Sequence, residues 1–117
     1  MTQIGSAFLP VSNPAVAVEW YSKVFGFKVV SSEAHAAVLE SDEPVRKLTL
    51  LGPASGISAK PGLPWAPFNL VAEDLEALRE RLGEDGDEVG QVSGDDQTCF
   101  WFTAADPDGN TLLIVDR

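Results

Sequence analysis

The sequence predicts an α+β protein built from two βαβββ modules. Strand-like and helix-like segments occur in the same order in both halves, and a stretch rich in Gly, Pro and Ser separates the halves. Residues also match at an offset of 60 positions: Val11 with Val71, Ala17 with Ala77, Val18 with Leu78, Gly26 with Gly86, and Val29 with Val89. A duplicated module explains matches spread over a helix and its exit. Each module leaves one sheet face uncovered, so the two are expected to form a curled mixed sheet with a cleft.

The first module is predicted from one strand, one helix and three further strands. An apolar run over Ile4–Val11 indicates the first strand. Asn13 is a favoured N-cap and Pro14 then falls at the first helical position, so a helix is expected up to Phe25 with Gly26 as its C′ residue. The three strands that follow are expected at Phe27–Ser31, Ala34–Leu39 and Arg46–Leu51, with a turn at 41–44 before the last one.

The second module is expected to repeat this order after the separating stretch. The chain is interpreted as one domain over 1–117, with modules at about 1–52 and 65–117 and a linker at 53–64. A helix capped by Glu73 or Asp74 should run to Leu82, with Gly83 past its end. The strands are expected at Trp65–Val71, Glu88–Val92, Thr98–Thr103 and Thr111–Val115, and the turn Asp106–Asn110 joins the last two in a hairpin.

Composition excludes several classes of function. The formal net charge is -10, and a phosphate backbone or an anionic membrane requires basic side chains, so neither is expected as a partner. No apolar run reaches the roughly 20 residues that span a bilayer, and the N-terminus lacks the pattern of a secretory signal. The chain has one cysteine, which leaves no intramolecular disulfide. We therefore expect a cytoplasmic protein.

Four segments resemble the vicinal oxygen chelate superfamily, which contains glyoxalase I, bleomycin-resistance proteins, fosfomycin-resistance enzymes and extradiol dioxygenases. The segments are 11–14, 17–27 with its aromatic-Tyr and Gly-Phe helix exit, 68–75, and the Asp-Pro-Asp-Gly-Asn turn at 106–110. The resemblance implies paired βαβββ modules, a cleft in the curled sheet, and a homodimer with sites near the subunit interface. It does not by itself determine the chemistry.

The resemblance also implies where a divalent metal would be bound, and the residues there do not suit it. Enzymes of the superfamily hold the metal with His and Glu side chains. Carried over to this sequence, the ligand positions fall on Ala7, on Leu48 or Thr49, near Pro67 and on Leu113. A shift of one residue brings in Ser6, Phe8, Phe68, Leu112 or Ile114, none of which replaces His or Glu. His35 is the only histidine, so no metal and no other cofactor is expected.

Aromatic residues in the second module are the main candidates for a ligand-binding surface. Trp65, Phe68, Phe100, Trp101 and Phe102 all belong to segments of its sheet. Alternation sends Phe100 and Phe102 to one face and Trp101 to the other, and one of these faces must pack on the helix. We favour Trp65 and Trp101 for the exposed face, with Leu113 beside them. Phe100 and Phe102 are the alternative.

Four other residues are weaker candidates. His35 is a candidate general base, because the imidazole group in general can exchange a proton near neutral pH, although a lone histidine is usually a surface residue. Cys99 is interpreted as a small apolar residue, because a reactive thiolate needs a base or a helix N-terminus nearby. Glu40 and Asp42 are interpreted as the solvated end of a strand, although they would also place negative charge beside a cleft.

Two functions of different classes follow from these residues. The first is a metal-free protein resembling bleomycin-resistance proteins, which sequesters a small molecule in an aromatic-lined cleft. Surplus acidic charge and aromatic faces favour a planar, cationic ligand. The second is a glyoxalase-like lyase, isomerase or dioxygenase with a displaced metal site. A scaffolding role is neither supported nor excluded by the sequence.

Overall fold

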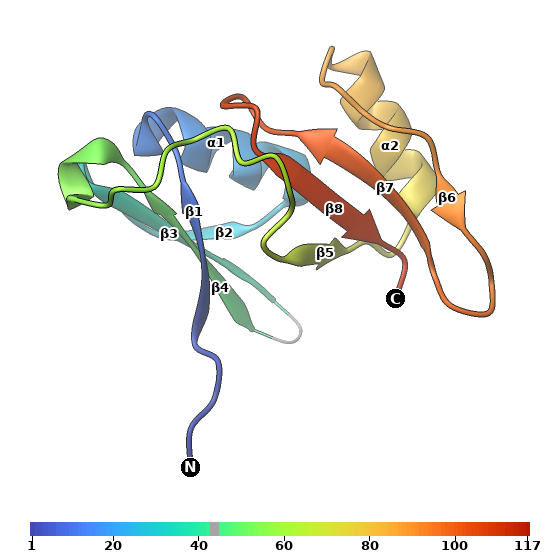
Figure 1. Cartoon of the computed structure of the whole chain (residues 1–117), viewed down its shortest axis with the longest axis horizontal. Coiled ribbons are helices and arrows are strands. Elements are labelled where there is room, and N and C mark those ends of the chain that lie inside the picture. Colours follow the sequence, from blue (N-terminus) through green and yellow to red (C-terminus); the bar gives the residue numbers. More distant parts are fainter. Residues whose placement is uncertain (43–44) are drawn as a thin grey trace. The chain divides into compact units, whose positions relative to one another are not determined.

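The computed structural model describes residues 1–42 and 45–117 and divides the chain into two compact units, residues 1–61 and 62–117. Each unit contains one four-stranded mixed sheet and one α-helix, in the order β-α-β-β-β (Figure 1). The α+β class and the βαβββ modules predicted from the sequence are therefore confirmed. The boundary between the units falls inside the stretch that was predicted as a linker.

In the first unit the first strand pairs with the last strand of an open sheet. Its elements are β1 (Ser6–Pro10), α1 (Pro14–Phe25), β2 (Lys28–Ser32), β3 (Ala36–Ser41), β4 (Arg46–Leu51) and the short 3₁₀ helix η1 (Pro53–Ser55). The strand order is β1-β4-β3-β2, with β1 parallel to β4 and the other neighbours antiparallel. The turn predicted at 41–44 includes residues 43–44, which lie outside the described part of the chain.

The second unit has the same topology with shorter edge strands. Its elements are β5 (Asn69–Val71), α2 (Leu75–Glu84), β6 (Ser93–Gly94), β7 (Phe100–Ala105) and β8 (Thr111–Val115). The strand order β5-β8-β7-β6 repeats that of the first unit, again with a parallel pair between the first and last strands. This repetition is the structural counterpart of the residue matches at an offset of 60.

The helix ends explain why the residue matches include a pair of glycines. Asn13 accepts a hydrogen bond from the backbone N–H of Ala15 at 3.0 Å and caps α1, as predicted. Gly26 follows α1 with φ of 73°, and Gly86 follows α2 with φ of 83°. Both occupy the left-handed region that favours glycine. Gly83 was predicted beyond the helix, but it lies within α2, because the chain turns only at Gly86.

At its other end α2 is capped by Asp74, whose carboxylate accepts from the Ala77 N–H at 3.1 Å. The strand predicted at Thr98–Thr103 is observed two residues later, as β7, and two other predicted strands of this unit form only in part. Trp65–Val71 contributes only Asn69–Val71, because Leu63 instead accepts a hydrogen bond from the Thr111 N–H and Pro64 and Pro67 lack donors. Glu88–Val92 forms only an isolated bridge, between Val89 and Ala104.

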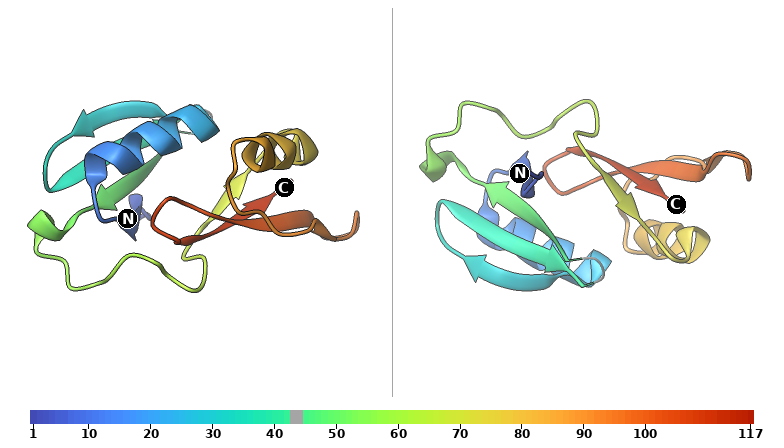
Figure 2. Two further views of the ribbon diagram at one scale, coloured as in Figure 1. Left: turned by 90° about the horizontal axis from the view of Figure 1, so that it is seen from above. Right: turned by 90° about the horizontal axis from the view of Figure 1, so that it is seen from below.

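Each helix covers one face of its own sheet and leaves the other face open (Figure 2). In the first unit Leu9, Leu39 and Leu50 are fully buried on the side of α1, whereas Phe8, which neighbours Leu9 along β1, is 56% exposed. In the second unit Phe102 and Ile114, which are opposite each other in the ladder, are fully buried in the core to which α2 contributes Leu82. The alternate residues of β7 and β8 therefore form the open face.

The turn between β7 and β8 holds the incoming chain of the second unit. Asn110 is fully buried, and its side-chain oxygen accepts hydrogen bonds from the backbone N–H groups of Gly62 and Leu63, both at 2.9 Å. Its amide nitrogen donates to Asp106 at 3.0 Å. The other carboxylate oxygen of Asp106 accepts from the N–H groups of Asp108 and Asn110. Asp106–Asn110 thus forms a buried polar cluster, which we call the turn clasp.

Candidate functional site

The open face of the second sheet brings together two of the residues predicted to bind a ligand. Trp101 lies opposite Val115 in the ladder, and Leu113 lies opposite Thr103, one step along the same face. Asn69 of β5 is the other neighbour of Leu113. Trp101 is 37% exposed and Leu113 is half-buried. This face therefore combines an accessible indole with an aliphatic side chain.

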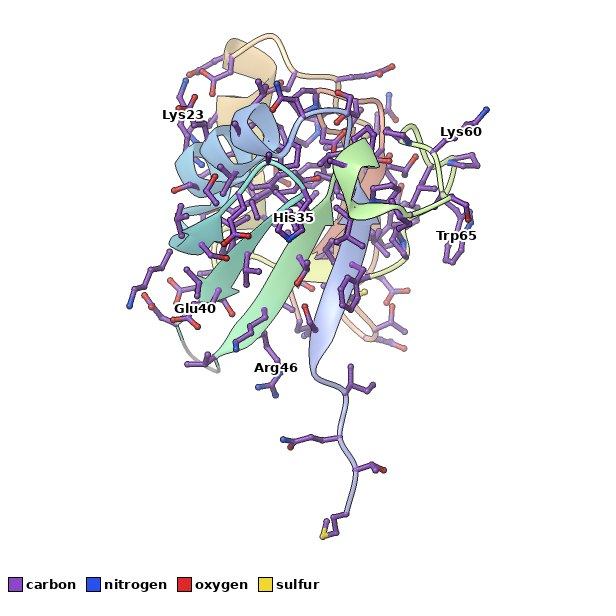
Figure 3. All side chains as sticks on the ribbon, turned by 90° about the vertical axis from the view of Figure 1, so that its left-hand side faces the viewer. Lys23, His35, Glu40, Arg46, Lys60 and Trp65 are labelled. Atoms are coloured by element: carbon purple, nitrogen blue, oxygen red, sulfur yellow. The ribbon has the colours of Figure 1, made fainter. Side chains whose placement is uncertain are left out.

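Of the other predicted aromatic residues, Phe100 and Phe102 lie on the opposite face of β7, and Trp65 lies outside the strands. Phe100 and Phe102 point to the opposite side, where Phe102 is fully buried in the core and Phe100 remains 37% exposed at the start of β7. Trp65 lies in the segment before β5, and its ring projects outward from the chain with 65% exposure (Figure 3). The sequence left the choice of face open. The burial of Leu112 and Ile114 at alternate positions of β8 identifies the covered face, and Trp101 lies on the other one.

The loop before β7 is fixed by contacts of two kinds. Asp95 accepts hydrogen bonds from the backbone N–H and the hydroxyl of Thr98 and from the N–H of Gln97, and these bonds lower the pKa of its carboxyl. Arg117 donates to the carbonyl oxygens of Thr98 at 2.9 Å and Asp96 at 2.5 Å. These bonds hold the hairpin that carries Trp101 on β7.

The open face of the first sheet carries a row of polar side chains that the sequence analysis missed. Lys28, Glu40, Lys47 and Ser6 are successive neighbours across β2, β3, β4 and β1, and we call them the polar row. The Nζ of Lys28 lies 4.0 Å from Oε1 of Glu40. The hydroxyl of Ser6 lies 3.0 Å from that of Thr49. The signal in the sequence is the alternation of these residues with buried leucines along the inner strands.

The remaining candidates occupy exposed or peripheral positions. His35 precedes β3, and its Nδ1 lies 3.5 Å from a carboxylate oxygen of Glu33, with both side chains more than half exposed. Cys99 is a half-buried free thiol in the loop before β7. Glu40 and Asp42 lie at the end of β3, as predicted, with Glu40 at the opposite end of that strand from His35 (Figure 3).

The residues present do not fit the metal that the resemblance implies. Over residues 1–42 and 45–117, no group of three or more His, Cys, Asp or Glu side chains is arranged to hold an ion. Thr49 and Leu113, two of the carried-over positions, lie on open sheet faces and offer a hydroxyl and an isobutyl group. Ala7 lies opposite the buried Leu48, on the side of α1. Divalent metals of this kind require imidazole or carboxylate ligands.

A shallow pocket lies at the end of the first sheet. Its volume is about 240 Å³, below the range of most ligand sites. It is formed by Val11 and Leu51 at the ends of β1 and β4 and by the segment from Pro53 to Pro61, which includes Ile57 and Lys60. Its walls are mostly apolar. None of the residues predicted from the sequence to bind a ligand contributes to it.

Among the helices of residues 1–42 and 45–117, none has the length and apolar character needed to cross a bilayer. The helices measure 12 and 10 residues, against the roughly 20 that a bilayer requires.

The chain is similar to a known protein family and to several solved structures. A family model of the Glyoxalase/Bleomycin resistance protein/Dioxygenase superfamily matches residues 3–114. A search of curated protein sequences finds no match. Among solved structures, a superfamily member from Sphaerobacter thermophilus DSM 20745 has a TM-score of 0.81 at 17% identity, with 98% of this chain and 97% of the other covered.

Two further structures carry more specific names. A lactoylglutathione lyase from Agrobacterium tumefaciens has a TM-score of 0.77 at 17% identity, covering 98% of this chain and 93% of the lyase. A bleomycin resistance determinant encoded on the transposon Tn5 has a TM-score of 0.73 at 18% identity, covering 99% and 98%. At these identities the similarity shows a shared fold, which is common to catalysts and binding proteins.

Proposed function

Because the chain belongs to the Glyoxalase/Bleomycin resistance protein/Dioxygenase superfamily, we propose that it is a metal-free protein that binds and sequesters a small aromatic molecule. The observation that carries the proposal is the placement of Trp101 and Leu113 on the open face of the second sheet. An accessible indole next to aliphatic surface is suited to stacking on a planar ring. The bleomycin resistance determinant of Tn5 provides a precedent for binding within this fold.

Charge favours a cationic ligand for this face. Residues 62–117 contain thirteen acidic and three basic side chains, so the second unit carries the whole net charge of the chain. Long-range attraction to such a surface concentrates cations near it, and an indole face adds a cation–π contact. A planar aromatic cation therefore matches both properties of the face.

The test is calorimetric titration with bleomycin and with 9-aminoacridine, a planar aromatic cation. We expect Trp101→Ala to weaken binding of the better probe by about tenfold, the loss typical of a stacked tryptophan. Phe100→Ala is the matched control, because Phe100 is equally exposed and adjacent in sequence but lies on the other face. Equal losses in both variants, or binding that is insensitive to both, would remove this face from the function.

Trp65 and the rest of the predicted set are tested in the same titration. Trp65→Ala should weaken binding if the exposed ring contributes to the ligand site. Unchanged affinity would restrict the site to the residues of β7 and β8. The homodimer expected from the resemblance is tested separately by sedimentation of the free protein.

The alternative function is a lyase, isomerase or dioxygenase, and the similarity to lactoylglutathione lyase is the observation that favours it. This alternative requires a bound metal at residues other than the carried-over positions. Loading the protein with nickel, manganese, zinc and ferrous iron, followed by dialysis, distinguishes the two functions. We expect no stoichiometric retention, and one retained ion per chain would replace our proposal with the enzymatic one.

A further inference from the structure

We infer that the open face of the first sheet binds the carboxylate end of a small amphipathic organic anion, with Lys47 as the group that pairs with it. This inference goes beyond the proposed function, which concerns an aromatic cation on the second sheet. It rests on the polar row, on a pair of hydroxyl groups next to that row, and on an exposed apolar surface that continues from them. Each of these lies within the first unit.

Among the residues that the structure describes, the polar row holds one cation more than its carboxylates can pair. Glu40 is only partly exposed and lies 4.0 Å from the ammonium of Lys28, at the β2 side of the row. On its other side Glu40 is the ladder neighbour of Lys47. Within the described residues, no carboxylate comes within 4.0 Å of the Lys47 ammonium. A bound carboxylate would supply the missing negative charge at this point of the row.

The hydroxyl pair supplies a hydrogen-bond donor beside Lys47. The Ser6 hydroxyl lies 3.0 Å from Thr49 Oγ1, 3.2 Å from the Lys47 carbonyl oxygen and 3.1 Å from that of Ala7. Its one proton has three acceptors within reach. When Ser6 donates to Thr49, the Thr49 proton is available to a ligand oxygen. Thr49 is half-buried and lies two residues from Lys47 on the same face of β4, so the hydroxyl and the lysine side chain are donors on one face of the sheet.

An apolar surface continues from the hydroxyl pair and selects the body of the ligand. Phe8 is the ladder neighbour of Thr49 and is 56% exposed. Val38 flanks Thr49 on the other side, on β3. A molecule with an aromatic or aliphatic body and one terminal carboxylate would therefore cover Phe8 with its body and reach Lys47 with its charge. A dianion or a fully polar anion would leave Phe8 exposed to water.

The charge balance of the first unit makes it the part of the chain that tolerates an anion. Residues 1–61 contain five basic and five acidic side chains, whereas the surplus of ten acidic side chains lies in residues 62–117. The first unit therefore has no surplus of negative charge of its own that would repel an anion from Lys47.

The test uses 2-naphthoate, its neutral methyl ester and 2-naphthylmethylamine in calorimetric titrations of the full chain. We expect the carboxylate to bind more tightly than the ester by about tenfold, the value of a charged hydrogen bond, and this preference to shrink as salt increases. The amine should bind no more tightly than the ester. Lys47→Gln should remove the preference for the carboxylate and Lys47→Arg should retain it. Lys23→Gln is the matched control, since it removes the same charge from α1 (Figure 3).

Further variants separate this inference from the proposed function. Phe8→Ala should weaken both the carboxylate and the ester, and Trp101→Ala should leave both unchanged. The inference is overturned if the ester or the amine binds as tightly as the carboxylate, if Lys47→Gln and Lys23→Gln behave alike, or if Trp101→Ala alone abolishes naphthoate binding. The first two results leave the proposed function intact. Loss of 9-aminoacridine binding in Trp101→Ala, with naphthoate binding unchanged, supports both.

Discussion

The first unit (residues 1–61) and the second unit (residues 62–117) have the same strand order but are held together differently. Helix α1 buries five of its twelve residues, whereas α2 buries only Leu75 and Leu82 of its ten. The outer strands of the second sheet are also shorter, with three residues in β5 and two in β6. In place of this missing apolar contact, the second unit has the turn clasp, which buries Asp106 and Asn110. One duplicated topology is thus stabilised mainly by apolar burial in one copy and with an added polar network in the other.

The two units also differ in charge, and this difference bears on ligand choice. The first unit has equal numbers of acidic and basic side chains, and the second carries the full net charge of the chain. Net self-repulsion weakens a compact state, so the second unit needs directional hydrogen bonds to keep its loops in place. In the proposed function, the same charge attracts cations to the Trp101 face. Duplication has therefore preserved the backbone while the side chains on the open faces diverged.

The largest expected effect on stability comes from removing a buried apolar side chain of the first unit. Leu50 is fully buried on the inner strand β4, so Leu50→Ala should reduce the free energy of unfolding by about 3 kcal/mol through lost burial and a residual cavity. Urea unfolding followed by circular dichroism measures this loss. Leu78→Ala, at a half-buried position of α2, should cost about 1 kcal/mol. A larger cost for Leu78→Ala than for Leu50→Ala would reverse the comparison.

The turn clasp should yield a slightly smaller effect. Asn110→Ala leaves the N–H groups of Gly62 and Leu63 without their acceptor, and we expect a loss of about 2–3 kcal/mol in the free energy of unfolding. Amide hydrogen exchange should accelerate first at residues 62–63. Asn69→Ala is the control, because Asn69 is exposed in the same unit. Equal stability of the two variants would mean that the clasp contributes nothing beyond an ordinary turn.

The helix exits should behave alike in the two units, which sharpens the comparison. Gly26→Ala and Gly86→Ala should each lower the free energy of unfolding by about 1 kcal/mol, because alanine is strained at positive φ. A Cβ at either position would have no atom within 4 Å, so sterics against neighbours add nothing. Thermal denaturation measures both. A marked difference between the two variants would show that the exits are not equivalent.

The smallest expected effect is a pH dependence in the second unit. Hydrogen bonds from Thr98 and Gln97 hold the pKa of Asp95 below its ordinary value. A lowered pKa in the folded state adds stability above the unfolded-state pKa, and this is lost as pH falls through the folded-state pKa. We expect Asp95→Asn to flatten the acid side of the plot of melting temperature against pH. An unchanged slope would show that Asp95 adds no pH-dependent stability.

The sequence predicted those parts of the fold whose signals are local. Asn13, Pro14 and Gly26 fix the ends of α1 through their own backbone and side-chain preferences, and the Asp106–Asn110 turn fixes its hairpin in the same way. The residue matches at an offset of 60 then predicted that the second half has the same strand and helix order as the first. The residue matches already indicated Gly86, rather than Gly83, as the glycine that follows α2, because Gly86 corresponds to Gly26 at the offset of 60.

Features that depend on distant partners were not predictable from the sequence. Whether Trp65–Phe68 continues β5 depends on Leu63 bonding to Thr111, and the face of Trp101 depends on which side α2 covers. The polar row was not predicted, because it also depends on how the strands pair. Lys28, Glu40 and Lys47 lie on three successive strands and become neighbours only through the register of those strands.

The parallel pairing of first and last strands has a consequence for synthesis on the ribosome. β1 cannot pair until β4 has been synthesised. The four strands of the first sheet can therefore assemble once the chain has emerged to about Leu51. β5 must likewise wait for β8, which is complete only when Val115 has been added. The two copies therefore mature in succession, as expected for units that fold from the N-terminus. A nascent second unit exposes Phe102 and the inner side of α2 to chaperones until β8 has been made.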